Sequence, residues 1–141
     1  MAVWSSLGPL EIAKWNLLAR AAPWKARTIL GMLADHIIVA TTTISEEVAR
    51  ALAAGAIDAK LGACAQIIGP ITSVFRWNGE VQTEQEWRLE IKTTADRVAA
   101  LTEHIKHNHS YDLPEIIAIP ITGGSTEYLS WLIAETRAEP L

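Results

Sequence analysis

A long hairpin pattern in the middle of the chain restricts the fold more than any other feature of the sequence. Residues 63–77 are typical of one strand, Asn78-Gly79 is a hairpin turn signal, and residues 80–92 alternate between two faces. Arms of about 13 residues would each span roughly 43 Å, whereas most strands have about five or six residues. Arms this long expose edge hydrogen-bonding groups, so we expect them to pair with other copies of the chain in a closed homo-oligomer.

The alternation along residues 80–92 predicts one buried and one solvated face. The expected buried set is Val81, Thr83, Gln85, Trp87, Leu89 and Ile91, and the expected solvated set is Gln82, Glu84, Glu86, Arg88, Glu90 and Lys92. In the first arm, Gly69-Pro70 interrupts the strand pattern. Because proline cannot donate a hydrogen bond to the ladder, this point predicts a bulge, a bend or an edge.

The loop at the hairpin tip determines which residues face each other. A two-residue loop at Asn78-Gly79 would place Phe75 opposite Gln82, an apolar residue beside a polar one. A three-residue loop that adds Trp77 would instead place Phe75 opposite Val81. Since the apolar sets of both arms would then share a side, we expect the three-residue loop or an equivalent bulge.

The segments on either side of the hairpin complete an alternating order of strands and helices. The expected elements are a strand at 36–43, a helix from a capping box at 43–46 to Gly55, a helix from Thr93-Thr94 through Ile105, a strand at 115–121, and a helix capped by Ser125 with Tyr128, Leu129, Leu132 and Ile133 inward. The order is β-α-β-β-α-β-α, which inserts a hairpin between two βα units. We therefore expect an α+β domain with the ferredoxin-like β-α-β-β-α-β plan and a C-terminal helix.

The charge of the chain changes sharply near residue 35. Residues 1–34 hold four bases and one acid, whereas residues 35–141 hold eight bases and fifteen acids. This shift predicts a boundary, with 1–34 a basic extension that is non-native or loosely attached, and 35–141 the domain. The net charge of −4 argues against nucleic-acid binding, and the apolar runs are too short to span a bilayer. A single cysteine excludes an internal disulfide, and we expect a cytoplasmic location.

One short segment offers metal ligands. His109, Asp112 and Glu115 lie within seven residues and supply nitrogen and oxygen atoms that suit Cu(II) or Zn(II). A solvated helix end is the more ordinary explanation for the histidine cluster that begins at His104.

A second segment offers an anion site. Gly123, Gly124 and Ser125 lie between a strand and a helix, where backbone amides hold anions, although any strand-to-helix turn shares this property. The sequence has none of the common hydrolase or nucleotide-binding fingerprints, nor a convincing nucleophile with a general base. We therefore expect no enzymatic activity.

Several stretches taken together resemble the CutA divalent-cation-tolerance family. They are TTTISEEVARAL (41–52), LGACAQI (61–67), SVFRWNGEV (73–81), EIKTT (90–94), HSYDLPEIIAIPI (109–121) and GSTEYLSW (124–131). The resemblance covers about residues 36–137, with the motifs in the order typical of the family. The fixed separation of its Tyr-x-x-Pro-Glu and Tyr-Leu-x-Trp elements makes a chance match improbable.

The resemblance implies a homotrimer with an architecture similar to PII signalling proteins, in which extended hairpins pack between subunits. It also implies tolerance of divalent metals and binding of Cu(II) or another divalent cation in clefts between subunits. The residues that match those clefts are Trp77, Lys92, His109, Tyr111, Glu115, Tyr128 and Trp131. Thr41 stands where some members place a metal-binding cysteine, and Asn108 replaces one histidine of a pair. These differences weaken the expected copper affinity more than they affect the fold.

We therefore expect a divalent-cation tolerance protein that is a cytoplasmic homotrimer without an organic cofactor and binds neither nucleic acid nor membranes. In this hypothesis His109, Asp112 and Glu115 hold the metal, while Trp77, Lys92, Tyr111, Tyr128 and Trp131 line the cleft. Binding would buffer the metal or alter the hairpin surface seen by an unidentified protein partner. The alternative is a PII-like signalling adaptor that holds a nucleotide or a small anionic metabolite at Gly123 and Gly124 with the help of basic side chains.

Overall fold

A computed structural model describes residues 36–137, so the predicted basic extension at 1–34 lies outside the described residues. The elements are β1 (His36–Thr43), α3 (Glu46–Asp58), β2 (Cys64–Trp77), β3 (Glu80–Thr94), the 3₁₀ turn η2 (Ala95–Arg97), α4 (Val98–Asn108), β4 (Ile117–Pro120) and α5 (Thr126–Glu135). The four strands form one antiparallel sheet in the order β2-β3-β1-β4. This arrangement confirms the predicted ferredoxin-like order with a C-terminal helix.

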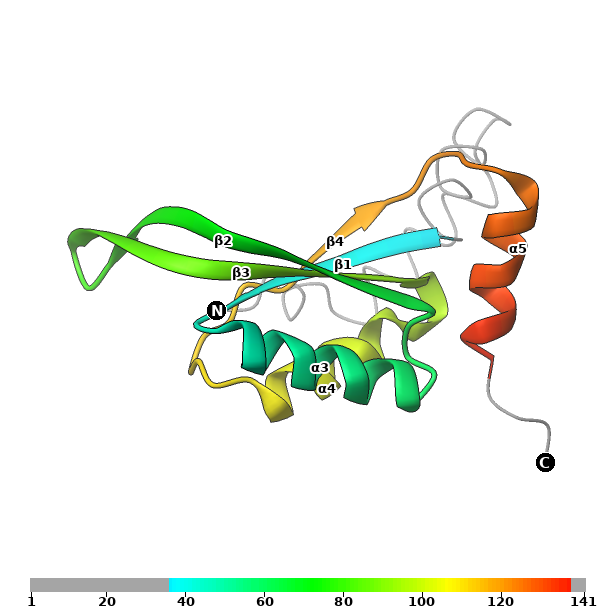
Figure 1. The fold of residues 1–141 in the computed structure, drawn as a ribbon, viewed down its shortest axis with the longest axis horizontal. Coiled ribbons are helices and arrows are strands. Elements are labelled where there is room, and N and C mark those ends of the chain that lie inside the picture. The colour runs from blue at the N-terminus through cyan, green and yellow to red at the C-terminus, as the bar shows by residue number, and fades with distance from the viewer. Residues whose placement is uncertain (1–35, 138–141) are drawn as a thin grey trace, which may run out of the picture.

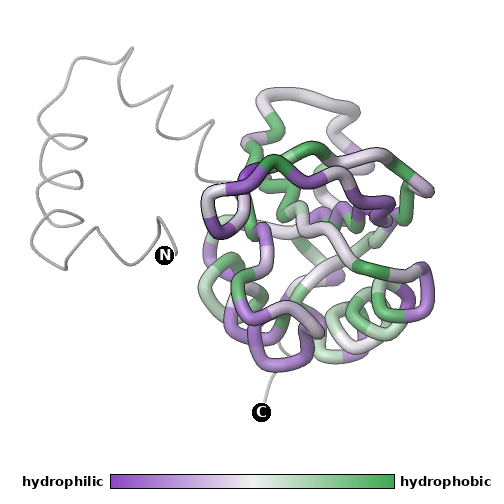
Figure 2. The backbone as a smooth tube through the Cα atoms, turned by 90° about the vertical axis from the view of Figure 1, so that its left-hand side faces the viewer, coloured by the Kyte–Doolittle hydropathy of each residue, from purple (hydrophilic) through white to green (hydrophobic). Residues whose placement is uncertain are grey.

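The domain has two layers, with the sheet on one side and α3 and α4 on the other (Figure 1). Viewed from the hairpin tip, the two helices lie side by side below the sheet (Figure 2). The core between the layers is built from fully buried side chains of β1, β3, α3 and α4, among them Val39, Leu52, Leu89, Ile91, Leu101 and Ile105. Alternate strand residues thus meet the apolar faces of two helices. None of the helices in residues 36–137 is long and apolar enough to cross a membrane.

Both ends of α3 differ from the prediction. The helix begins after Ser45, whose hydroxyl accepts a hydrogen bond from Val48 N at 3.2 Å, while the Thr43 hydroxyl bonds the Ser45 carbonyl instead of capping. Gly55 does not end the helix, which continues to Asp58. A Cβ atom at Gly55 would lie 2.9 Å from His104 Cε1, so this glycine allows α4 to approach α3 closely.

The two helices after the hairpin also differ from the prediction: α4 begins at another residue, and α5 buries fewer side chains. The turn of η2 separates Thr94 from α4, so the second helix begins at Val98 rather than at Thr93-Thr94. The predicted cap of α5 is confirmed, because the Ser125 hydroxyl accepts a hydrogen bond from Tyr128 N at 3.2 Å. Of the four side chains expected to point inward from α5, Leu132 alone is buried, and Tyr128 and Ile133 are each 40% exposed.

A bulge at Gly69-Pro70 divides the hairpin into two halves. In the inner half, Cys64–Ile68 pairs with Arg88–Lys92, and in the outer half Ile71–Trp77 pairs with Glu80–Glu86. Gly69 and Pro70 together oppose Trp87 alone, which is the two-against-one count of a β-bulge. The outer half extends beyond α3 and α4, away from the body of the domain (Figure 1).

The predicted three-residue loop at the tip is wrong. Trp77 pairs with Glu80 and Phe75 with Gln82, so Asn78 and Gly79 form a two-residue loop. Both loop residues have positive φ, 50° and 80°, as the turn preferred by two-residue hairpins requires. The outer half lies away from the helices of residues 36–137 (Figure 1), so the turn rather than core burial determines its register. The bulge then restores the apolar pairing further in, where Ile67 faces Leu89.

The expected burial pattern of β3 is confirmed only in the inner half. Leu89 and Ile91 are fully buried, but Val81 is 64% exposed although it belongs to the apolar set. Conversely, Glu86 belongs to the set that the alternation predicts to be solvated, but it is only 7% exposed.

Candidate functional site

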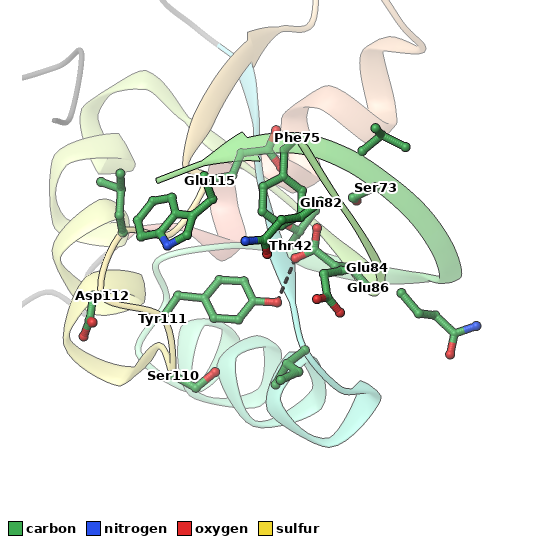
Figure 3. Close-up of a pocket in the computed structure, with 15 residues that line it drawn as sticks. Thr42, Ser73, Phe75, Gln82, Glu84, Glu86, Ser110, Tyr111, Asp112 and Glu115 are labelled. Carbon is green, nitrogen blue, oxygen red and sulfur yellow. Dashed lines mark hydrogen bonds between the residues drawn. The ribbon is translucent and has the colours of Figure 1, made fainter. Parts of the chain in front are cut away.

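A pocket of about 750 Å³ lies where the outer half of the hairpin meets the loop between α4 and β4 (Figure 3). One wall consists of side chains from paired positions of β2 and β3, where Ser73 faces Glu84 and Phe75 faces Gln82. The opposite wall is the α4–β4 loop with Tyr111 and Asp112. We call this site the hairpin pocket; its other lining residues are Thr42, Ile44, Val74, Trp77, Gln85, Glu86, Ser110, Leu113 and Glu115.

The hairpin pocket has a strongly negative lining. Four of its described lining residues are carboxylates, and none is Lys, Arg or His. Three of the four, Glu84, Asp112 and Glu115, are exposed at its rim, whereas Glu86 is buried. Because like charges gathered in one concave site raise the local concentration of counter-ions, the pocket favours cations over anions.

Tyr111 and Glu86 form the central polar contact of the pocket. The Tyr111 hydroxyl donates a hydrogen bond of 2.8 Å to Glu86 Oε2, and the two side chains point toward each other from opposite walls (Figure 3). Burial of the phenol, together with this bond to a carboxylate, raises the pKa of Tyr111 above its usual range. Tyr111 is therefore a neutral donor at physiological pH.

His109 lies behind the pocket and connects the loop to the sheet. Its Nδ1 accepts a hydrogen bond from Tyr111 N at 3.0 Å, so Nε2 carries the proton and donates to the Thr42 carbonyl at 2.9 Å. Its ring lies 4.9 Å from the Tyr111 ring. Burial lowers the pKa of His109, which favours this neutral form. In this arrangement His109 orients Tyr111 towards Glu86.

The predicted metal ligands are only partly brought together. Asp112 and Glu115 both line the hairpin pocket, whereas His109 does not line it and uses both ring nitrogens within the chain. Within residues 36–137 no three His, Cys, Asp or Glu side chains converge closely enough to hold a metal ion. A metal site formed by these residues would therefore need the His109 ring to release one of its two hydrogen bonds, or ligands from another chain.

The predicted ligand cleft is divided between the two ends of the domain. Trp77 and Tyr111 lie in the hairpin pocket. At the other end, Lys92 Nζ lies 5.6 Å from the centre of the Tyr128 ring and donates a 2.8 Å hydrogen bond to Gln66. The rings of Tyr128 and Trp131 are 5.5 Å apart. The predicted cleft residues therefore do not come together within one chain, because the hairpin tip and α5 lie at opposite ends of the domain (Figure 1).

The predicted anion-binding turn lies at the start of α5. Gly123, Gly124 and Ser125 are exposed there, and the Ser125 hydroxyl is engaged in capping the helix. A Cβ at Gly124 would lie 3.4 Å from the Leu129 side chain, whereas one at Gly123 would meet open space. Anion binding at this turn stays a prediction.

Sequence reasoning did not identify Glu86 as a site residue. Strict alternation along β3 predicts the solvated face for it, together with Glu84. It is buried because the α4–β4 loop places Tyr111 against it, and this contact joins residues 25 positions apart. The Gly69-Pro70 bulge lies in β2 and leaves the alternation of β3 unchanged, so no local pattern in the sequence indicates the burial of Glu86.

Comparisons with known proteins agree on one family. A model of the family described as CutA1 divalent ion tolerance protein matches residues 37–135. The chain is 48% identical over 101 residues to rice "Protein CutA 1, chloroplastic", covering 72% of this chain and 57% of the relative. It is 44% identical over 99 residues to the "Divalent-cation tolerance protein CutA" of Thermus thermophilus, covering 70% of this chain and 96% of the relative.

A solved structure supports the same relationship. The crystal structure of CutA1 from Oryza sativa superposes with a TM-score of 0.72 at 45% identity, covering 77% of this chain and 99% of that chain. The chain spans a little over half the length of the curated plant relatives that it matches.

Proposed function

The chain belongs to the CutA1 divalent ion tolerance protein family, and from this premise we propose that it binds Cu(II) or another divalent cation at the hairpin pocket. The names of the family and of its relatives describe tolerance of divalent cations rather than a catalysed reaction. Direct binding of the cation is the simplest way in which such a protein would lower the concentration of free metal.

The observation that carries this proposal is the charge of the pocket. Glu84, Glu86, Asp112 and Glu115 line it, and no cationic side chain is among its described lining residues. Carboxylate oxygens are ligands for divalent metals, and a concave wall brings them closer together than a flat surface would. Asp112 and Glu115 lie on the loop wall, where a metal would link the loop to the hairpin.

We propose that His109 joins these two carboxylates as the nitrogen ligand. To do so, its ring must release either the bond to the Thr42 carbonyl or the bond from Tyr111 N. The depressed pKa of His109 keeps the imidazole neutral, which is the form that binds metals. Tyr111 and Lys92 contact no metal in this proposal and shape the surrounding cleft.

We further propose a homotrimer whose subunits complete the clefts. In one chain the outer half of the hairpin leaves Val74, Val81 and Trp77 at 66%, 64% and 43% exposed, and α5 leaves Trp131 at 42%. Large apolar side chains exposed together at the two ends of a domain indicate contact surfaces. Packing of a hairpin tip against the α5 end of a neighbour would unite Trp77 with Lys92 and Tyr128.

We propose the cytoplasm as the location. The one cysteine, Cys64, is half-buried and free, which suits a reducing compartment. The rice relative is named chloroplastic, so a fluorescent fusion of the full chain, viewed by microscopy in its native cell, is the appropriate measurement.

Native mass spectrometry with and without one equivalent of Cu(II) per chain tests both the metal and the assembly. We expect a trimer that retains about one metal per chain, and no retained metal in the His109→Ala/Glu115→Ala variant. Zn(II) in place of Cu(II) would show which divalent cation binds more tightly.

The matched control is His107→Ala/Glu103→Ala, which removes the same residue types from the exposed surface of α4. Equal metal retention by the site variant and the wild type would contradict the ligand assignment. A metal-free trimer that is stabilised by ATP or ADP would favour the signalling adaptor instead, because a ligand specific for the native state raises the melting temperature. A monomer would contradict the proposed clefts between subunits.

A further inference from the structure

The C-terminal helix α5 has few buried side chains that could hold it against the sheet. Leu132 is the one residue of α5 that is buried, and Tyr128 and Trp131 are 40% and 42% exposed. The next buried residue is Thr136, immediately after the helix. Because a single buried side chain does not fix the direction of a helix, the contacts at its last turn determine where its first turn lies.

Two arginines bind the carbonyl groups at the last turn of α5. Arg97 Nε, from η2, donates a 2.6 Å hydrogen bond to the Thr136 carbonyl, and Arg137 Nε donates a 3.1 Å bond to the Ile133 carbonyl. The last carbonyls of a helix have no partner within it, and cationic side chains at this end also interact favourably with the helix dipole. The two guanidinium groups therefore satisfy the end of α5.

The same residues connect this turn to the end of β3. Arg137 Nη1 and Nη2 donate to the Asp96 carboxylate at 2.7 and 2.9 Å, and Nη2 also donates to Thr94 Oγ1 at 2.6 Å. The Thr94 hydroxyl in turn donates to Asp96 Oδ1 at 2.6 Å. Because Thr94 is buried, the bonds beside it are better shielded from water than those at the surface. We call this group the C-terminal clasp; its residues are Thr94, Asp96, Arg97, Thr136 and Arg137.

The C-terminal clasp shares one face of β3 and one face of α5 with residues of the predicted ligand cleft. Lys92 and Thr94 are two residues apart on β3 and so point to the same side of the sheet. Tyr128, Leu132 and Thr136 are spaced four residues apart and follow one face of the helix. Lys92 Nζ lies 5.6 Å from the centre of the Tyr128 ring, and Thr94 Oγ1 lies 3.4 Å from Thr136 Oγ1. The clasp therefore determines how Tyr128 approaches Lys92.

We propose that Arg97 and Arg137 are positioning residues for the cleft between subunits. They fix the direction of α5 and thereby hold Tyr128 and Trp131 where the hairpin tip of a neighbouring copy meets them. Ordering α5 in the free chain lowers the entropy that assembly has to remove. This inference rests on the proposed homotrimer, and it assigns a role to two residues outside both the predicted cleft and the predicted metal ligands.

Analytical ultracentrifugation of the full chain across a dilution series tests the effect on assembly. Arg137→Met keeps a long apolar side chain but removes the guanidinium group. We expect the protein concentration at which half of the trimer dissociates to rise about tenfold, because contact with a neighbour must then also order α5. Arg97→Met should act in the same direction. Asp96→Asn keeps an acceptor oxygen for Arg137 and should leave the assembly as in the wild type.

Arg50→Met is the matched control, because Arg50 is an exposed arginine that pairs with Glu46 on α3. Equal weakening of the trimer in Arg50→Met and Arg137→Met would show an effect of net charge alone and would overturn the proposal. Unchanged assembly in both Arg137→Met and Arg97→Met would also overturn it. Circular dichroism of each variant checks that the domain is folded.

A second measurement detects the position of Tyr128 within one chain and does not depend on the trimer. In the NMR spectrum of lysine-labelled protein, the Tyr128 ring should shift the signal of the Lys92 methylene next to Nζ, and Lys92→Arg identifies that signal. We expect it to move towards that of a solvent-exposed lysine in Arg137→Met and to stay in place in Asp96→Asn.

The two measurements together separate this inference from the proposed assembly. A Lys92 signal that does not move in Arg137→Met contradicts the positioning role, whatever the oligomeric state. A monomeric wild type in which the signal does move contradicts the homotrimer and supports the control of Tyr128 by the C-terminal clasp.

Discussion

The inner and outer halves of the hairpin are continuous in sequence but follow different physical rules. In the inner half, Leu89 and Ile91 are fully buried against α3 and α4, and their partners Ile67 and Ala65 point to the same side. In the outer half, Val81 is 64% exposed and faces the exposed Arg76. Core burial determines the register of the inner half, and the two-residue turn determines that of the outer half.

Within one pair of strands, the inner half contributes mainly to stability and the outer half mainly to binding. The inner half supplies part of the hydrophobic core, so its residues are constrained by packing. The outer half contributes walls of the hairpin pocket and large exposed apolar side chains, so it is available for contacts with ligands and other chains. Substitutions in the two halves should therefore have different consequences.

The largest expected effect is from truncation of a core side chain of the inner half. Leu89→Ala should lower the free energy of unfolding by about 2–5 kcal/mol, because a fully buried leucine leaves a cavity. Val81→Ala in the outer half should change it by less than about 0.5 kcal/mol. Urea denaturation followed by circular dichroism, at one fixed protein concentration, measures both changes.

A large loss of stability in Val81→Ala would contradict this division of the hairpin within one chain. Repeating the measurement across a range of protein concentrations then identifies its source. A loss that depends on concentration places Val81 in a contact between copies.

A substitution at the bulge that separates the halves should have an intermediate effect on the free energy of unfolding. A Cβ at Gly69 would lie 2.4 Å from Trp87 Cδ1, so Gly69→Ala must displace the indole ring and should cost about 1–3 kcal/mol. Gly79 at the tip is the matched control, because its Cβ would meet no atom within 4 Å and only its φ of 80° opposes alanine. Gly79→Ala should cost about 1 kcal/mol.

The near-ultraviolet circular dichroism spectrum distinguishes these two glycine variants. Gly69→Ala should change the tryptophan signal because Trp87 moves, and Gly79→Ala should change it less. An unchanged spectrum in Gly69→Ala would mean that the backbone of the bulge, rather than the ring, absorbs the extra atom.

The smallest expected effect on the free energy of unfolding comes from a substitution at the end of the domain opposite the hairpin tip. Asp96 accepts hydrogen bonds from Arg137 Nη1 at 2.7 Å and Nη2 at 2.9 Å, which tie the end of α5 to η2. These bonds, with a further one from Thr94, hold the pKa of Asp96 well below its usual range. Because the pair is solvent-exposed, Asp96→Asn should cost less than about 1 kcal/mol at pH 7.

The sign of the pH dependence follows from the depressed pKa. A carboxylate with a lowered pKa in the folded state contributes stability above its unfolded pKa of about 3.9, and this contribution is lost as the pH falls further. The difference in unfolding free energy between wild type and Asp96→Asn should therefore be constant from pH 7 to about 5 and narrow below pH 4. Amide exchange in the outer half of the hairpin should be the same in both proteins.

The sequence predicts the fold well because its signals are local and agree with one another. The strand at His36–Thr43 has the bounds that its β-branched run predicts, and Ser125 caps the helix that follows Gly124. The predictions fail where a contact between residues that are distant in sequence determines the local structure. Gly55 has the sequence character of a helix end, but the approach of His104 explains why a glycine stands inside α3.

The candidate site was less predictable than the fold because its walls come from three separate segments. The sequence indicates Tyr111, Asp112 and Glu115 on the loop and Trp77 on the hairpin, and these four all line the pocket. It could not assign Glu86 to the site, because the burial of this carboxylate depends on Tyr111 from beyond α4.

The bulge at Gly69-Pro70 also has a consequence for how this protein can vary over evolution. Since the extra residue decouples the register of the tip from that of the core, paired insertions or deletions beyond it would lengthen or shorten the ribbon by about 3.3 Å per residue in each arm. Such changes would leave the pairing of Ile67 with Leu89 untouched. The outer half is therefore a module that selection or protein engineering can redesign for a new ligand while the domain beneath it stays the same.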